Sequence, residues 1–375
     1  MIKLLSILTC ILTQTCVLAQ FNQDSLTHYS ILPNDTDPLI AAIGSDYHQI
    51  FYNPTSTPQN TLLVHLVGSG DTTGSTLLFP TLAANSGLHC INLDYRNGVS
   101  GQAACADVPN PDCHLNWRKE IIEGFNYSPD IIVSQSSSIN NRLLKLLQYL
   151  NSNTPNQNWG QYFSGNSILW NKIIVSGHSQ GGGHAAVIGI TQPVKRVLMF
   201  GSPNDYIDTL NLNAPWSSLP HVVSDSNYYS FNALYDEIVN YWKQYNHSQS
   251  LGQSTYGDTV LVDNSLYPFN NTRQLYTIQE APGGFPIELT HDIMIRDYET
   301  PINGLGEAEF ACVWTYMLGL NCQQSSAIDE LNSIDISKQL IKIVDFMGRE
   351  TEYKSNTILI YIYDDGTTEK VYRVE

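Results

Sequence analysis

Residues 172–187 of the chain read Lys-Ile-Ile-Val-Ser-Gly-His-Ser-Gln-Gly-Gly-Gly-His-Ala-Ala-Val. A β-branched run enters a Gly-x-Ser-x-Gly turn, and a helix-like run leaves it. A sharp strand-to-helix turn presents the hydroxyl of its central serine, Ser179, to a base and to a substrate. Gly177 and Gly181 flank this serine, where any Cβ would crowd the turn. The pattern predicts a nucleophile elbow, with an ordinary glycine-rich loop as the alternative for so short a motif.

Apolar runs that read as strands lie on both sides of this turn and alternate with helical runs. Leucine and isoleucine recur at helical spacing between Ser138 and Leu150, which predicts a helix before the strand that enters the turn. Alternating strands and helices predict an α/β fold with a mainly parallel sheet covered by helices. In such a sheet, functional residues collect at the carboxyl ends of the strands. The strand-like runs are residues 61–67, 87–93, 194–200, 228–234 and 274–278.

A serine hydroxyl needs a base, and the base needs an acid that orients it. In enzymes built around this turn, both follow the serine in the chain, each after a later strand. Asp236 comes directly after the run 228–234, and His291 is the next histidine after the run 274–278. We therefore expect Ser179, His291 and Asp236 to form a catalytic triad.

Other residues compete for these two roles. Glu237 follows the predicted acid directly, and Asp205 follows the first strand-like run after the turn, so each is an alternative acid. His178 and His184 flank the turn in sequence. The geometry of the turn directs their side chains away from the site or along the helix, which favours structural roles for both.

Negative charge that develops on a substrate carbonyl must be met by two N–H donors. One is expected from the backbone of Gln180, directly after the serine. The other is expected from Gly68 or Ser69, which follow the run 61–67 in a glycine-containing loop that lets backbone approach a substrate closely. The alternative for that loop is an ordinary turn.

Length and charge restrict the function classes. The chain has 375 residues, a formal net charge of -17, and 14% charged residues. This length suffices for one large α/β core with a small appendage. Recognition of phosphate backbones requires Lys and Arg patches that the sequence lacks, so nucleic acid is excluded as a partner.

Residues 1–19 have the features of an export signal. Lys3 supplies the positive start, residues 4–12 are mostly apolar, and Ala19 provides the small residue that a signal peptidase requires. The apolar run is too short to span a bilayer comfortably. We expect cleavage after Ala19 and a secreted or cell-surface protein.

Two of the 7 cysteines lie in that segment, which leaves five. Cys90 lies in the strand-like run 87–93, which predicts a buried free thiol. The other four bracket two short segments, and in an exported protein they predict two local disulfides, Cys105 with Cys113 and Cys312 with Cys322. Zinc is the competing interpretation, but no Cys-x-x-Cys pair or metal-spaced histidine cluster supports it, and neither a metal nor a cofactor is expected.

The chain resembles a family of exported bacterial α/β-hydrolases between about Thr61 and Cys322. The resemblance rests on the turn at residues 177–185, on the run that ends in Gly-Ser-Pro at residues 201–203, and on residues 291–294 and 313–318. It implies an α/β-hydrolase fold and a serine hydrolase with a Ser-His-Asp/Glu triad.

A second resemblance covers the end of the chain. Residues 341–350, 358–367 and 369–371 resemble the C-terminal sorting domains of bacterial type IX secretion. Alternating runs around the Asp-Gly turn predict a small antiparallel β unit in which Asp364 and Asp365 are turn residues. An accessory β module that binds a surface is the alternative. The expected organisation is a signal peptide at 1–19, an α/β-hydrolase catalytic domain at 20–322, a linker at 323–337 and a β sorting domain at 338–375.

These expectations combine into an exported serine hydrolase that cleaves a carboxylic ester through an acyl-enzyme. The substrate would be a small-molecule or polymer-linked ester, and the secretion machinery would engage the C-terminal domain. A serine peptidase or amidase with the same triad is one alternative. A non-catalytic binding protein on the same fold is the other.

Overall fold

The computed structural model describes residues 25–41, 46–281, 290–322, 340–345, 349–351, 354, 359–363 and 368–371. The predicted signal peptide and the predicted linker lie outside the described residues. The chain divides into two compact units, Met1–Cys322 and Gln323–Glu375. Among the described residues, no helix is long and apolar enough to cross a membrane.

The first unit is built on a nine-stranded sheet in the order β1-β2-β4-β3-β7-β8-β11-β13-β12. All neighbours from β4 to β12 pair in parallel, whereas β1 pairs with β2 and β2 pairs with β4 in antiparallel fashion. The strands are β1 (Thr27–Ile31), β2 (His48–Tyr52), β3 (Leu62–Leu66), β4 (His89–Asn92), β7 (Ile173–His178), β8 (Arg196–Phe200), β11 (Tyr228–Ala233), β12 (Val260–Leu261) and β13 (Gln274–Thr277).

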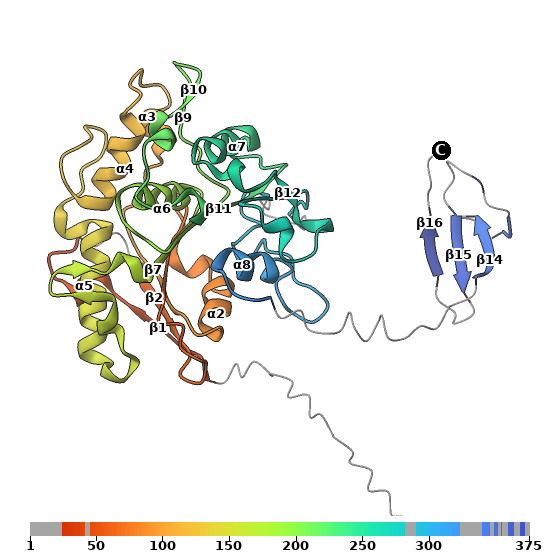
Figure 1. Ribbon diagram of the computed structural model, residues 1–375, viewed down its shortest axis with the longest axis horizontal. Helices are drawn as coiled ribbons and strands as arrows, with labels where there is room; N and C mark the ends of the chain where they lie inside the picture. Colours follow the sequence, from red (N-terminus) through yellow and green to blue (C-terminus); the bar gives the residue numbers. More distant parts are fainter. Residues whose placement is uncertain are drawn as a thin grey trace, which may run out of the picture. The chain divides into compact units, whose positions relative to one another are not determined.

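Helices cover both faces of this sheet (Figure 1). On one face α4 (Cys113–Glu123), α5 (Ile139–Asn153) and α6 (Gln180–Thr191) enclose one apolar cluster, and on the other α2 (Leu78–Asn85) and α8 (Ala311–Leu318) enclose a second. Every residue of β3 and β7 is buried, because both faces of these central strands are covered. The mainly parallel α/β architecture predicted from the sequence is therefore confirmed.

The remaining elements of the first unit are short or peripheral. Two small antiparallel hairpins pair β5 with β6 and β9 with β10. Their bounds, with those of the remaining helices, are β5 (Phe163–Ser164), β6 (Ser167–Ile168), β9 (Tyr206–Ile207), β10 (Leu212–Asn213), α1 (Pro33–Thr36), α3 (Gly101–Cys105) and α7 (Tyr241–Ser250).

Helix α5 shows how the sequence pattern becomes structure. The Ser138 hydroxyl accepts a hydrogen bond from the Asn141 N–H and so caps the first turn. The buried apolar side chains that follow recur mostly every three or four positions, which turns one face of the helix toward the core. They are Ile139, Leu143, Leu146, Leu147 and Leu150.

Both predicted disulfides are present. Cys105 is joined to Cys113 with a Cα–Cα distance of 5.6 Å, and Cys312 is joined to Cys322 with a Cα–Cα distance of 5.1 Å. Cys90 is a free, buried thiol on β4, as expected from the apolar run around it.

The second unit contains a three-stranded antiparallel sheet in the order β14-β15-β16. Its strands are β14 (Leu340–Asp345), β15 (Leu359–Tyr363) and β16 (Thr368–Val371). The turn predicted around Asp364 and Asp365 lies outside the described residues.

Candidate active site

Ser179 lies at the junction between β7 and α6, directly after the last residue of the strand. Its backbone has φ 51° and ψ -117°, in the left-handed half of conformational space that costs a residue with a side chain on the order of 1–3 kcal/mol. Its N–H donates to the Phe200 carbonyl at 2.8 Å, at the end of the neighbouring strand β8. The strained turn is thus held between two parallel strands at the carboxyl end of the sheet.

The flanking glycines are explained by close backbone approach. A Cβ on Gly177 would lie 2.2 Å from the carbonyl carbon of Gly181, and a Cβ on Gly181 would lie 2.0 Å from the Leu66 oxygen. Neither distance is compatible with a side chain. Glycine at both positions therefore lets α6 start immediately beside β3 and β7.

Asp236 and His291 are brought together by the loops that follow β11 and β13. Asp236 Oδ2 lies 2.7 Å from His291 Nδ1, and the side chains are 0% and 5% exposed. The carboxylate is held by three further donors, because Oδ1 accepts the N–H groups of Ile238 (2.9 Å) and Val239 (2.6 Å), and Oδ2 accepts Gln244 Nε2 (2.8 Å). The acid expected from chain order is the one that contacts the expected base.

The environment of His291 favours its protonated form. Burial alone lowers the pKa of this imidazole, but the hydrogen bond and charge of Asp236 outweigh that effect, and the charges of Asp292 and Glu237 add to them. The pKa of His291 is therefore raised above 6.5. A base with this property is fully neutral only in mildly alkaline solution.

The imidazole of His291 lies beside the elbow. Its ring centroid is 4.8 Å from that of His178. Gly201 follows Phe200, whose carbonyl accepts the Ser179 N–H, and a Cβ placed on Gly201 would lie 3.2 Å from His291 Cε1. The buried Nε2 has no hydrogen-bond partner among the described residues, Ser179 included. Nucleophile–base hydrogen bonds commonly form only once substrate is bound.

His178 differs from expectation. Instead of pointing away from the site, its ring packs on His291, and its Nε2–H donates to the His291 carbonyl at 3.0 Å. This hydrogen bond holds the backbone of His291, so the contact agrees with the structural role that the sequence favours for His178. His184 stacks on Trp117 with a centroid distance of 5.4 Å, inside the core beneath α6.

The two alternative acids have other partners. Asp205 is buried and accepts from Arg118 Nε at 2.6 Å and from Trp216 Nε1 at 2.8 Å. Glu237 lies near the base, but its carboxylate accepts the backbone N–H of His291 at 3.4 Å and does not bind the ring. Neither carboxylate is hydrogen-bonded to a nitrogen of the His291 imidazole.

The loop predicted to complete the oxyanion hole lies against the serine. A Cβ on Gly68 would lie 3.4 Å from Ser179 Cβ. Asn97 fixes this loop, because its Nδ2 donates to the carbonyls of Gly68 (2.9 Å) and Asp71 (2.8 Å), and its own carbonyl accepts the Gly70 N–H (3.0 Å). None of these hydrogen bonds uses the N–H group of Gly68 or of Ser69.

The second predicted donor, Gln180, opens helix α6. Its N–H is one of the first in that helix, which an α-helix leaves without an intrahelical acceptor. Its carbonyl accepts Arg118 Nη1 at 2.9 Å, so a buried arginine fixes the helix start. Arg118, Asn97 and Gln244 were missed by sequence reasoning. Only Asn97 carried a signal, since it closely follows the strand-like run 87–93.

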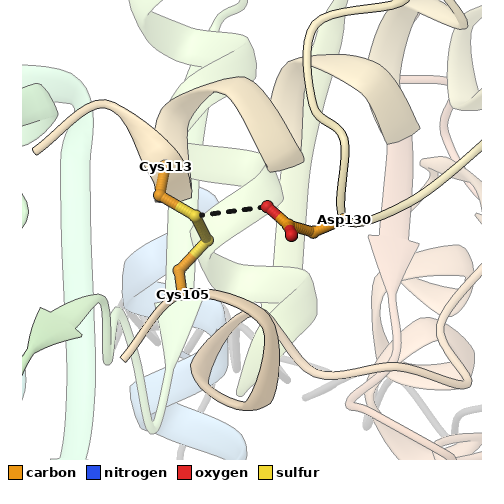
Figure 2. Close-up of side chains that lie close together, drawn as sticks. All are labelled: Cys105, Cys113 and Asp130. Atoms are coloured by element: carbon orange, nitrogen blue, oxygen red, sulfur yellow. Dashed lines mark hydrogen bonds between the residues drawn. A yellow bond between two sulfur atoms is a disulfide. The ribbon is translucent and has the colours of Figure 1, made fainter. Parts of the chain in front are cut away.

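Among the residues that the structure describes, two groups of side chains lie close enough to share a metal ion, and both have other partners. Figure 2 shows the first, Cys105, Cys113 and Asp130, in which both sulfurs belong to the disulfide and so offer no thiolate. The Asp130 carboxylate lies 3.7 Å from Cys113 Sγ, which has no proton to donate, so this is a contact and not a thiol hydrogen bond. In the second group, His178 donates to the His291 carbonyl, the His291 imidazole binds Asp236, and Asp292 accepts from Arg296 Nη1 at 2.7 Å.

Two surface hollows of about 480 Å³ each are lined by other parts of the first unit. One is lined by Gln279 and Glu280 together with residues between Asp297 and Ile302, and the other by residues of α4, α5 and the segments around them. Neither includes Ser179, His291 or Asp236. Residues 282–289, which precede His291 in the chain, lie outside the described residues.

No protein-family model matches the sequence, and no curated protein matches it. The geometry of the site must carry the functional argument by itself.

Proposed function

We propose that the chain is an exported serine hydrolase of the α/β-hydrolase fold that cleaves carboxylic esters. The observation that carries the proposal is the 2.7 Å bond from Asp236 to His291 beside a serine in a strained strand-to-helix turn. The parallel sheet, the serine–acid–histidine order along the chain and the buried, unpartnered Nε2 of His291 support it.

The reaction follows from these positions. His291 Nε2 takes the hydroxyl proton as Ser179 Oγ bonds to the acyl carbon, and Asp236 holds the ring by its Nδ1–H. The carbonyl electron pair moves onto oxygen and is met by the N–H groups of Gln180 and of the Gly68–Ser69 loop.

When the carbonyl re-forms, the bond to the alcohol oxygen breaks and His291 returns its proton to that oxygen. Water then attacks the acyl-enzyme while His291 accepts a proton from it. Collapse of this second adduct releases the carboxylic acid product, and His291 returns its proton to Ser179 Oγ. No electrons are exchanged, and water is the only co-reactant.

Exposed apolar side chains around the acid support an uncharged substrate. Tyr235, Ile238 and Trp242 are 54%, 57% and 60% exposed, on the loop that carries Asp236 and on the following helix α7. Aromatic rings of this kind contact acyl chains, aryl groups or sugar faces. The net charge of -17 disfavours an anionic substrate.

Steady-state hydrolysis tests the proposal and separates ester from amide chemistry. The chain beginning at Gln20 is assayed with p-nitrophenyl acetate, p-nitrophenyl octanoate and an acyl p-nitroanilide, beside Ser179→Ala and His291→Ala. We expect ester turnover that both variants lose. Cleavage of the anilide alone would favour the amidase, and turnover by Ser179→Ala would overturn the assignment.

Export through a cleaved signal at 1–19 and a sorting domain at 338–375 belongs to the same proposal. Two disulfides in the first unit support it, because disulfides persist in oxidising compartments. Expression in a bacterium that has type IX secretion, with and without residues 338–375, provides the test. Secretion that is unchanged without those residues would contradict the sorting role.

A further inference from the structure

Arg296 joins two loops that meet at the proposed site. Its Nη1 lies 2.7 Å from Oδ2 of Asp292, the residue directly after the base, and its Nε lies 3.5 Å from Oδ2 of Asp71. Asp71 closes the Gly68–Asp71 loop that carries the oxyanion donors, because its N–H donates to the Gly68 carbonyl at 3.3 Å. One guanidinium therefore contacts the histidine segment and the oxyanion loop at once.

The next residue makes the same connection by different bonds. Asp297 accepts the N–H groups of Leu77 (2.8 Å) and Leu78 (3.0 Å) at the start of α2, and its own N–H donates to the Ser75 carbonyl at 3.0 Å. The Ser75 hydroxyl in turn donates to Asp71 Oδ2 at 2.7 Å. The connection that follows the oxyanion loop is thus attached to the histidine segment at several points.

Asp292 is held from the opposite side by the elbow. Its Oδ1 lies 3.4 Å from His178 Nε2, the same nitrogen that donates to the His291 carbonyl. The side chains of Asp292 and His178 are both less than one-tenth exposed. A continuous series of contacts therefore runs from the elbow through Asp292 and Arg296 to the oxyanion loop.

We propose that Arg296 is a positioning residue for the proposed hydrolysis, which holds the oxyanion loop against the segment that carries His291. The inference rests on the proposed function, because it gives a role to a residue that touches no reacting atom. Preorganised donors stabilise the transition state since they need no rearrangement when charge develops. A misplacement of about 1 Å costs on the order of 100-fold in rate.

An arginine suits this role better than a lysine. The guanidinium presents several N–H donors in a fixed plane and can meet two carboxylates in different directions, whereas an ammonium is a single point charge. Arg296 also faces Glu299, whose Oε1 lies 3.8 Å from Nη1. Three carboxylates therefore surround one cation, and a guanidinium, which stays protonated, provides the positive charge that they need.

Arg296→Met and Arg296→Lys test the proposal, with Lys145→Met as the matched control. Lys145 lies on α5, where its Nζ is 4.0 Å from Asp37 Oδ2, and it belongs to no part of the proposed site. We expect kcat of both Arg296 variants to fall about 10- to 100-fold with KM changed less than about threefold, because the lost interaction acts in the transition state. Lys145→Met is expected to keep the kcat of the wild type.

A transition-state analogue gives a readout that a general loss of packing would not move. A trifluoromethyl ketone forms a serine adduct with an oxyanion, so its affinity should fall by the same factor as kcat/KM in Arg296→Met, with the affinity of the product acid unchanged. Asp71→Asn keeps the shape of the loop and should lower both quantities in the same direction. It carries the test if Arg296→Met does not fold.

Two results overturn the inference. Unchanged kcat in folded Arg296→Met would do so, as would an equal loss of affinity for ketone and product acid. A wild-type chain that forms no ketone adduct at all would instead refute the proposed function, so the two failures are distinguishable.

Discussion

His291 Nδ1 lies 2.7 Å from Asp236 Oδ2, although the two residues are 55 positions apart in the chain. The loops after two neighbouring parallel strands, β11 and β13, carry them to the same edge of the sheet. Asp236 is also held by two backbone N–H groups and by Gln244, so the carboxylate is fixed where it binds Nδ1, and the buried Nε2 has no partner among the described residues. In the proposed reaction, Asp236 therefore positions the imidazole of His291 and does not need to accept its proton.

Asp236→Asn should lower kcat for ester hydrolysis by roughly 10³- to 10⁴-fold, because an amide stabilises the wrong tautomer of the imidazole. Steady-state kinetics with p-nitrophenyl acetate measure this effect. Asp263→Asn is the control. Asp263 accepts a hydrogen bond from Thr277, at the end of the strand β13 that precedes His291, and it does not contact the His291 imidazole. Equal losses in the two variants would show that the effect is not specific to the acid.

The pH dependence of wild type and Asp236→Asn should differ. The pKa of His291 is raised above 6.5 by Asp236, so the acidic limb of kcat/KM should lie above pH 6.5 in the wild type and move to lower pH in the variant. The stability of the fold should depend on pH in the opposite direction to kcat/KM. A raised pKa contributes stability that is complete below about pH 6.5, the value in an unfolded chain, and is lost as pH rises through the folded value.

Urea unfolding between about pH 5 and pH 9 measures that contribution. The free energy of unfolding of the wild type should fall with rising pH relative to that of Asp236→Asn. Parallel stability curves for the two proteins would contradict the linkage, as would an acidic limb that does not move.

Asp205→Asn should destabilise the fold by about 3–5 kcal/mol, because it leaves the buried Arg118 without its carboxylate. Burial by itself raises the pKa of Asp205, but the charge of Arg118 outweighs it and holds that pKa below its usual range. The stabilisation is therefore present above about pH 4 and is lost as pH falls further. Asp208→Asn is the control, since Asp208 pairs with Lys243 at 3.4 Å on the surface. Equal melting temperatures for the two variants would contradict this account.

Gly181→Ala should destabilise the protein by at least about 1–3 kcal/mol and remove activity, because the added methyl group would lie 2.0 Å from the Leu66 oxygen. Gly98→Ala adds the same group where no atom lies within 4 Å and should be tolerated. Thermal unfolding of both variants provides the measurement. A normal melting temperature and activity in Gly181→Ala would show that the elbow is not packed as described.

Thiol titration tests both disulfides at once. The chain beginning at Gln20 should release no reactive thiol when native, because Cys90 is buried and burial raises its pKa. In guanidinium chloride without reductant, one thiol per chain should react, since the other four cysteines are paired. Three or five reactive thiols would mean that one or both pairs are open.

The sequence predicted those parts of the structure that arise from local patterns. The runs 61–67 and 228–234 became β3 and β11 because their mainly apolar side chains fit a strand that is buried on both faces. Asp236 was located by strand order alone, because the carboxyl ends of parallel strands share one edge of the sheet.

Contacts between distant segments could not be read from such patterns. His178 packs on His291 because the segment after β13 returns to the elbow, and no periodicity encodes that return. Arg118 is a charged residue in the middle of an ordinary amphipathic helix, and only its partner Asp205, from a loop after β8, explains its burial. Arg296 and Asp71 likewise meet only after folding.

Covalent labelling tests the central claim most directly. After reaction of the chain beginning at Gln20 with a fluorophosphonate, intact-protein mass spectrometry should show one adduct per chain, and none in folded Ser179→Ala. Mass spectrometry of the digested protein should place that adduct on the peptide that contains Ser179. An adduct that persists in Ser179→Ala, or a wild-type chain that is not labelled, would contradict the assignment of Ser179 as the nucleophile.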